Sequence, residues 1–301
     1  MKTRCNSLII KNFLLFFMLA LWFTSCEKEE PGVQIDYLKL YKEPNYPKKA
    51  GGRFLKNITY QYPDSSSASN FPIEDGIKVE FFYNAKNYVD YFKIYGSGTD
   101  SVGRVVKIEY NLTGLVSRIK YFNPDSVIIA FELFEYSAQK QLTRISKYEL
   151  AEDQIAYALA SYNKFSYPSP DKIEELRYLK SLNFDRPFKD IYFYDAAGNI
   201  KEKIDYEYDT PNPYSSMEFY YNNKKRPFEN LGLPAYEISY DSFQKSEIFS
   251  KNHMIGWQTY SYDSSVKVAV GDSLRFKMNY DSLDYPVSRE GSIFYNYIDL
   301  E

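Results

Sequence analysis

The sequence lacks most of the side chains on which catalytic and metal sites depend. Its 301 residues include two cysteines, Cys5 and Cys26, and one histidine, His253. A Ser-His-Asp triad would have to use His253, and a zinc site would have a single histidine ligand. No GxSxG, HExxH, P-loop or GxGxxG motif accompanies it. We interpret His253 as a loop histidine and expect no enzyme activity, metal or cofactor; paired carboxylates among the 40 acidic residues leave a hydrolase open as the least favoured alternative.

An excess of one charge is also absent. The chain has 37 basic and 40 acidic residues, a formal net charge of −3, and no basic stripe along its length. Proteins that bind nucleic acids usually carry a strongly basic surface because they neutralise phosphates. We therefore expect no nucleic acid partner.

Long apolar runs are scarce, and the clearest one lies near the N-terminus. Lys2, Arg4 and Lys11 give a basic start to an almost unbroken apolar run from Phe13 to Phe23. This run is shorter than the ~20 residues that a membrane-spanning helix needs. A basic start followed by a short apolar run is typical of a signal peptide, here residues 1–25.

The next residue, Cys26, resembles the cysteine of a bacterial lipobox, whose thiol is lipidated and which becomes the new N-terminus. Thr24 and Ser25 are the small residues that such a motif places before the cysteine. Several acyl chains, at ~0.8 kcal/mol per buried methylene, would hold the protein on a membrane. Because Cys5 would be removed with the signal peptide, the mature chain would have no free thiol. We expect Cys26 to be a lipid anchor.

The charged run Glu27, Lys28, Glu29 and Glu30 follows the anchor. In the simplest interpretation it is a solvated tether, which would extend over residues 26–35. It also resembles the acidic export signal with which Bacteroidetes carry lipoproteins to the outer face of the outer membrane. We expect a lipid-anchored outer-membrane protein that is exposed at the cell surface, with the periplasmic face as the alternative.

Aromatic residues are abundant: the chain has 32 tyrosines and 22 phenylalanines. Many tyrosines end an alternating apolar run and precede a short polar turn. Those that mark this position recur at steps of 26 to 31 residues: Tyr83, Tyr110, Tyr136, Tyr167, Tyr194 and Tyr221. A period of this size indicates a repeated supersecondary unit. We call these six residues the marker tyrosines.

The residues around the marker tyrosines predict β-hairpins. Turn-forming residues follow several of them: Asn84, Asn111, Gly114, Asp195 and Gly198. Apolar and charged residues alternate before each turn, so each strand has one apolar face and one charged face. We predict an all-β fold with very little helix, in which an antiparallel meander of hairpins forms a strongly curved or closed barrel-like sheet. One domain would cover residues 36–301, and residues 152–161 are the one segment that we predict to be helical.

Several segments, taken together with the tyrosine-aspartate hairpins, resemble a Bacteroidetes lipoprotein domain of unknown function with a porin-like β fold. They are RPFKD (Arg186–Asp190), KKRPFENLGL (Lys224–Leu233), SKNHM (Ser250–Met254) and YPVSREGSIFYNYI (Tyr285–Ile298). The resemblance covers most of the mature chain. It implies a curved or closed antiparallel sheet and supplies no catalytic residue.

Two functions remain open for such a protein. The first is a surface binding module, for glycans among other ligands, whose aromatic side chains would stack on sugar rings. The second is a structural or assembly lipoprotein whose exposed sheet edge or charged face engages an outer-membrane protein partner. The marker tyrosines themselves are interpreted as cross-strand packing residues.

Four Asp-Ser pairs are followed by an aliphatic residue. This pattern is a turn signal, and it also resembles the acceptor motif for O-linked glycans in the Bacteroidetes. A bulky glycan is tolerated only at the surface, where hairpin loops lie. We predict that at least one of these serines carries a glycan: Ser101, Ser126, Ser273 or Ser282.

Overall fold

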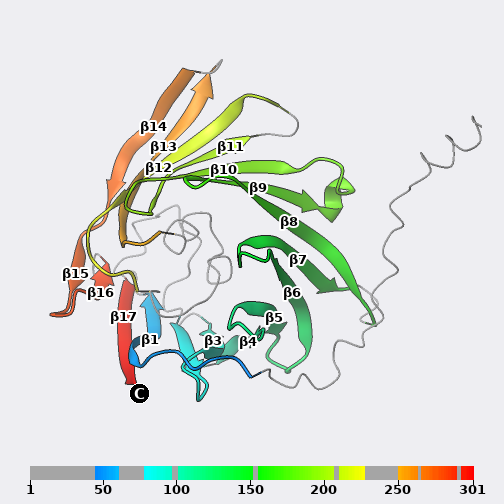
Figure 1. The fold of residues 1–301 in the computed structure, drawn as a ribbon, viewed down its shortest axis with the longest axis vertical. Helices are drawn as coiled ribbons and strands as arrows, with labels where there is room; N and C mark the ends of the chain where they lie inside the picture. Colours follow the sequence, from blue (N-terminus) through cyan, green and yellow to red (C-terminus); the bar gives the residue numbers. More distant parts are fainter. Residues whose placement is uncertain are drawn as a thin grey trace, which may run out of the picture.

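The computed structural model describes residues 45–60, 78–96, 101–151, 155–206, 210–227, 250–263, 266–289 and 293–301. These residues form one antiparallel sheet of 17 strands and one short 3-10 turn, η1 (Lys180–Leu182). The predicted all-β fold is confirmed, and the sheet curls strongly into a barrel-like shape (Figure 1). No helix in the described ranges is long and apolar enough to cross a membrane.

The strands are β1 (Gly52–Tyr60), β2 (Lys78–Tyr83), β3 (Val89–Tyr95), β4 (Val102–Tyr110), β5 (Val116–Phe122), β6 (Ile128–Tyr136), β7 (Leu142–Leu150), β8 (Tyr157–Ser169), β9 (Lys172–Leu179), β10 (Phe188–Tyr194), β11 (Ile200–Tyr206), β12 (Pro213–Tyr221), β13 (Met254–Asp263), β14 (Val266–Arg275), β15 (Met278–Tyr280), β16 (Pro286–Arg289) and β17 (Ile293–Leu300).

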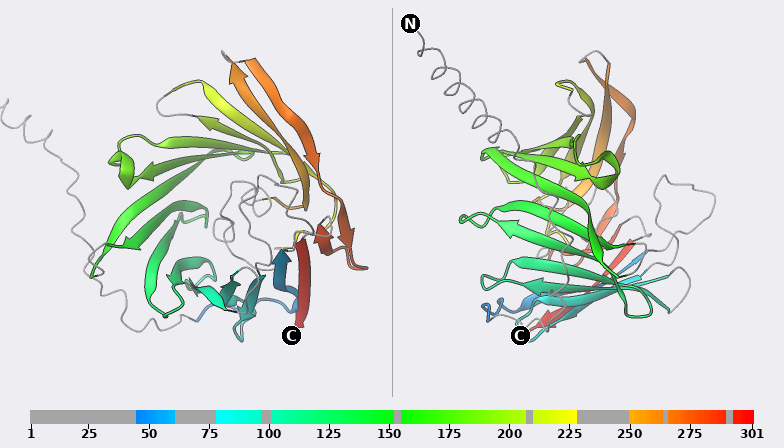
Figure 2. Two further views of the ribbon diagram at one scale, coloured as in Figure 1. Left: turned by 180° about the vertical axis from the view of Figure 1, so that it is seen from behind. Right: turned by 90° about the vertical axis from the view of Figure 1, so that its right-hand side faces the viewer.

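The sheet is a meander in which β1 lies between the last strand, β17, and β2. Each strand pairs antiparallel with the next from β2 to β14 and again from β15 to β17, and β1 pairs with both β17 and β2. Only Phe276 and Lys277 separate β14 from β15, so the chain changes its partner there from β13 to β16. The sheet is therefore strongly curved but not closed. Figure 2 shows the same curvature from behind and from the side.

Five hairpins share one turn geometry at one end of the sheet, which we call the tyrosine rim. A tyrosine at the end of one strand pairs with the residue six positions later, which begins the next strand: Tyr83 with Val89, Tyr110 with Val116, Tyr136 with Leu142, Tyr194 with Ile200 and Tyr280 with Pro286. The first turn residue accepts two backbone N–H bonds with its side chain: Asn84, Asn111, Ser137, Asp195 and Asp281. The predicted hairpin unit is confirmed.

The marker tyrosines tie neighbouring hairpins together. Their hydroxyls donate to the carbonyl of the first residue of a strand in the preceding hairpin: Tyr110 to Val89 at 2.7 Å, Tyr167 to Leu142 at 2.9 Å and Tyr221 to Ile200 at 2.8 Å. Burial accordingly raises the pKa of the Tyr194 hydroxyl to about 12. These three marker tyrosines therefore both pack with the core and satisfy a strand-end carbonyl, which gives a physical reason for the recurrence of tyrosine at this position.

One face of the sheet, the core face, carries a continuous apolar cluster with members from β1 to β17. Ile108 in β4 and Ile119 in β5 face each other there and are 3% and 0% exposed. Near the tyrosine rim, Tyr46 packs its ring against Tyr88 and Tyr110, with centroids 4.8 and 5.5 Å away. The N-terminal part of the described chain thus covers the core at this rim.

The helix predicted for residues 152–161 is wrong. Residues from Tyr157 onward form β8, which pairs with β7 on one side and β9 on the other. A short apolar run is compatible with either structure, and the free edges of the neighbouring strands are satisfied only by a strand. The predicted signal peptide (1–25) and tether (26–35) lie outside the described residues.

Candidate functional site

A row of polar side chains crosses the core face from β9 to β13 and reaches a valine in β14. Each member lies directly opposite the next in the strand registers: Glu175, Asp190, Asp205, Ser215, Ser261 and finally Val268. We call the first five residues the polar row. Its acidic end is buried, with Glu175 1% and Asp190 4% exposed, whereas Ser261 and Val268 at the other end are exposed. The core face therefore opens to solvent toward β14.

Glu175 is fully engaged at the buried end. Its Oε1 accepts a hydrogen bond from Asn163 Nδ2 at 2.5 Å, and its Oε2 accepts one from the Tyr192 hydroxyl at 2.7 Å. Such bonds offset the cost of burying a carboxylate in an apolar surface. Glu175 thus anchors the row structurally.

Asp190 and Asp205 form a pair around Lys203. The Lys203 ammonium lies 3.4 Å from Asp190 Oδ2 and forms an ion pair with Asp205, which also accepts a 2.8 Å bond from Ser215 Oγ. Burial raises the pKa of Asp190 to about 6, against the attraction of Lys203. For Asp205, Lys203 and its hydrogen bonds outweigh burial and lower the pKa. The arrangement places a carboxyl that can hold a proton beside an ionised one.

The sequence reasoning left carboxylate pairs open but did not single out this one. A signal was present, since Glu175, Asp190 and Asp205 stand 15 residues apart, one strand and one connection each. A 15-residue spacing brings the three carboxylates together only if the β9–β10 and β10–β11 connections have the lengths seen in this structure. In the described part of the chain, no group of three or more acidic or histidine side chains is placed to hold a metal ion.

The second notable feature is the outer edge of β14. This strand pairs with β13 along one edge, and among the described residues no ladder register occupies its other edge. Its apolar residues are unusually exposed: Val266 63%, Val268 48%, Val270 51% and Leu274 37%. A bulge separates Val270 from Leu274, and Gln258 Nε2 donates into it, to the carbonyl of Gly271 at 3.2 Å. Natural sheets usually cover or charge such an edge.

A pocket of about 370 Å³ lies at the tyrosine rim, between the β8–β9 and β10–β11 turns. It is lined by Pro170, Asp171, Tyr194, Asp195, Ala196 and Gly198. The pKa of Asp171 is lowered, first by a hydrogen bond from Ser169, so this carboxylate is ionised at neutral pH. The pKa of Asp195 is also lowered, because hydrogen bonds within its turn outweigh burial.

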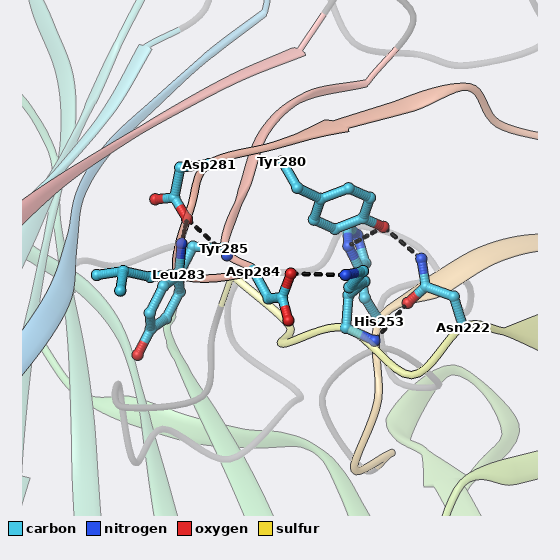
Figure 3. A network of polar contacts seen from close by, with 8 residues as sticks. Asn222, His253, Tyr280, Asp281, Leu283, Asp284 and Tyr285 are labelled. Atoms are coloured by element: carbon cyan, nitrogen blue, oxygen red, sulfur yellow. Dashed lines mark hydrogen bonds and ion pairs between the residues drawn. The ribbon is translucent and has the colours of Figure 1, made fainter.

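His253 lies in a polar network that joins the residues after β12 and before β13 to the β15–β16 turn (Figure 3). Its backbone N–H donates to the Lys224 carbonyl at 3.2 Å, its carbonyl accepts from Asn222 N–H at 3.2 Å, and its Nδ1 lies 3.3 Å from the Tyr280 hydroxyl. Lys224 also donates to Asp284 Oδ1 at 2.6 Å. His253 is 0% exposed, and burial lowers its pKa to about 3. A neutral, enclosed imidazole supports a structural role.

The residues predicted as sites from the sequence are not brought together. Cys26, Glu27, Lys28, Glu29 and Glu30 lie outside the described residues. All four candidate acceptor serines are exposed, but they lie apart: Ser101 before β4, Ser126 in the β5–β6 turn, Ser273 in β14 and Ser282 in the β15–β16 turn. Ser273 is thus in a strand and not in a loop. No signal in the sequence indicates the β14 edge, and the polar row is indicated only by the 15-residue spacing of its acidic members.

No protein family profile matches the sequence, and no curated protein matches it. Among solved structures, it is similar to a porin-like protein from Bacteroides uniformis ATCC 8492, at 8% identity over 85% of this chain and 100% of that chain, with a TM-score of 0.41. A porin-like protein from Bacteroides vulgatus ATCC 8482 is 13% identical over 83% of this chain and 100% of that chain, with a TM-score of 0.40. A TcdB2-TccC3-Cdc42 structure is 12% identical over 74% of this chain and 11% of that chain, with a TM-score of 0.29. The structural neighbours thus include porin-like Bacteroides proteins, at identities too low to assign a function.

Proposed function

We propose that the protein is a lipid-anchored outer-membrane lipoprotein that associates with a protein partner by strand addition at the free edge of β14. The observation that carries this proposal is the run of exposed valines on a strand whose outer edge has no ladder partner among the described residues, with Val268 48% exposed. An unpaired edge offers backbone N–H and C=O groups to an extended chain, and alternate side chains supply the apolar contact. Of the two functions that the sequence left open, we therefore favour assembly with a protein partner over ligand binding by the marker tyrosines.

The roles of the marker tyrosines support this preference. The hydroxyls of Tyr110, Tyr167 and Tyr221 already donate to backbone carbonyls, and their rings belong to the core cluster or pack against it. A tyrosine engaged in this way cannot swing out to stack on a sugar without breaking the hairpin contact. The edge of β14, in contrast, needs no rearrangement to accept a strand.

Amide hydrogen exchange tests the proposal. We expect those amides of Val266–Val270 that point away from β13 to exchange at least about tenfold more slowly in native outer membranes than in dilute purified protein, since a paired edge is protected. Ile108 in β4, which has neighbours on both edges, is the matched control and should be protected in both samples. Equal exchange of the β14 amides in the two samples would reject strand addition.

Glycan binding is the second candidate, and the rim pocket favours it. An aromatic edge from Tyr194 beside the ionised carboxylates of Asp171 and Asp195 suits a sugar, whose hydroxyls donate to carboxylates. A glycan array probed with the purified protein should then show binding that Asp171→Asn weakens and that Asp125→Asn, an exposed acid in a distant turn, leaves unchanged. Binding that is insensitive to Asp171 would exclude this pocket.

The anchor and its export signal are tested separately. Cys26→Ser should release the protein from the membrane fraction, because the acyl chains provide the attachment. Replacing Glu27, Glu29 and Glu30 by Ala should reduce labelling by an impermeant reagent while membrane attachment persists. Unchanged labelling would show that the charged run is only a tether.

Glycosylation of the exposed serines also stays a proposal. The intact mass of protein purified from its host should exceed that of a variant with Ser→Ala at all four positions by more than the substitutions explain. Equal corrected masses would dismiss it. Ser126 is a favourable site, because it lies exposed at a turn with a φ of 63°.

A further inference from the structure

We infer that the strand added at the edge of β14 is β14 of a second copy of this chain, antiparallel and centred on Val268. This inference rests on the proposed function and names its partner. It places Val268 opposite Val268 of the second copy, Val266 opposite Val270, and Lys267 opposite Ala269.

The local sequence supports this register. Val266-Lys267-Val268-Ala269-Val270 has the same apolar pattern when read in either direction from Val268. A two-fold axis through Val268 therefore brings valine opposite valine at three positions. β-branched residues favour strands, and such cross-strand pairs stabilise by roughly 0.2–1 kcal/mol each.

The valines share a face in the structure. Val266, Val268 and Val270 lie opposite Asp263, Ser261 and Thr259 of β13, so all three project to the core-face side. Pairing about Val268 would join the valines of both copies into one apolar stripe. It would also bring the two polar rows into line across the pair of β14 strands, since Ser261 is the cross-strand neighbour of Val268. The copies thus form one continuous surface.

The charges on the other face agree with self-pairing. Lys267 Nζ is held within its own chain by Glu202 at 2.6 Å and Glu218 at 2.7 Å, and these carboxylates raise its pKa against the effect of burial. In the proposed register Lys267 faces Ala269, so no like charges are opposed. A shift of the centre to Lys267 would oppose two lysines, which argues against that register.

The bulge sets the extent of the contact. Pairing cannot continue regularly past Val270, because the chain from Gly271 departs from the ladder, with a φ of 68° at Gly271. A contact over about five residues per copy is small, and interfaces of this class are weak in solution. Joint attachment to one membrane would raise the effective concentration.

A single-cysteine experiment tests the register. In the lipid-anchored mature chain Cys26 is acylated and Cys5 has been removed, so Val268→Cys introduces the only free thiol while the protein stays on the membrane. In the proposed dimer two residues at position 268 face each other within disulfide range, whereas two residues at position 270 lie roughly 13 Å apart along the strands. With a mild oxidant we expect at least about tenfold more disulfide dimer from Val268→Cys than from Val270→Cys.

A mixture of two variants completes the test. Val266→Cys and Val270→Cys proteins should form a mixed disulfide when combined, although neither dimerises efficiently alone. Circular dichroism checks that each variant is folded. Equal crosslinking of Val268→Cys and Val270→Cys, or none in either, would overturn the self-pairing. If membrane-dependent protection of the β14 amides persisted in that case, strand addition would stand and only the identity of the partner would be wrong.

Discussion

The β4–β5 and β13–β14 hairpins each contain a strand with alternating valines or other aliphatic residues, but they have very different surroundings. Both are antiparallel pairs with alternating aliphatic residues, yet Val106 is 1% exposed whereas Val268 is 48% exposed. The first hairpin has a strand on each side and lies over the core cluster. The second ends the ladder, on the part of the core face that opens to solvent. Alternation therefore specifies which residues share a face, and the neighbouring elements decide whether that face is covered.

The largest expected effect comes from breaking the buried hairpin. Tyr110→Ala removes a fully buried ring and a hydrogen bond to Val89, and should lower the free energy of unfolding by about 3–5 kcal/mol. Tyr110→Phe keeps the ring and should cost only about 1 kcal/mol. Val268→Ala, on the exposed hairpin, should cost under about 0.5 kcal/mol in dilute monomer. Urea denaturation measures all three, and similar costs for Tyr110→Ala and Val268→Ala would refute the contrast.

A pH-dependent effect follows from the enclosed His253. Burial and then the charge of Arg289 lower its pKa to about 3 from 6.5, so between these values the unfolded chain binds more protons than the folded one. The unfolding free energy should therefore fall as the pH decreases through this window, by up to about 5 kcal/mol. His253→Gln should abolish this slope. The measurement is urea denaturation at several pH values, and an unchanged slope in the variant would be inconsistent with a neutral buried imidazole.

The Asp190 carboxyl should give the opposite slope. Its pKa is raised by burial from 3.8 to about 6, so the folded chain binds more protons in this window and stability falls as the pH rises through it. The effect is at most about 3 kcal/mol. Asp190→Asn should remove it, whereas Asp205→Asn should lower stability at neutral pH, because the pKa of Asp205 is lowered in the folded state. Identical pH profiles for both variants would contradict the assignment of separate roles.

The smallest effect distinguishes two turns of the tyrosine rim. Gly114 and Lys140 occupy the same turn position with φ of 78° and 63°. Gly114→Ala should destabilise by about 1–2 kcal/mol. An alanine is strained at this positive φ, and its Cβ would in addition lie 2.4 Å from the Tyr88 hydroxyl. Lys140→Gly should stabilise by up to about 1 kcal/mol, because it relieves a left-handed side chain. Thermal unfolding measures both changes, and effects of the same sign would show that the two turns are not equivalent.

The hairpin unit was predictable because its determinants are local. The tyrosine, the turn side chain and the residue of positive φ lie within a few positions of each other, as in Tyr110, Asn111 and Gly114. Their hydrogen bonds close within the turn itself. The failure at residues 152–161 has the complementary cause, since the strand there is decided by β7 and β9 and not by its own apolar run.

The sequence alone determined the all-β repeat and its marker tyrosines, and it predicts lipidation at Cys26, because periodicity and short motifs act over neighbouring residues. Only the tertiary structure decided that Glu175, Asp190 and Asp205 become neighbours, because their contact depends on the register of three strands. It likewise decided that Val268 lies at an edge without a ladder partner in the described part of the chain, while Val106 is covered. Burial depends on what lies across a strand, and that partner can be distant in the sequence.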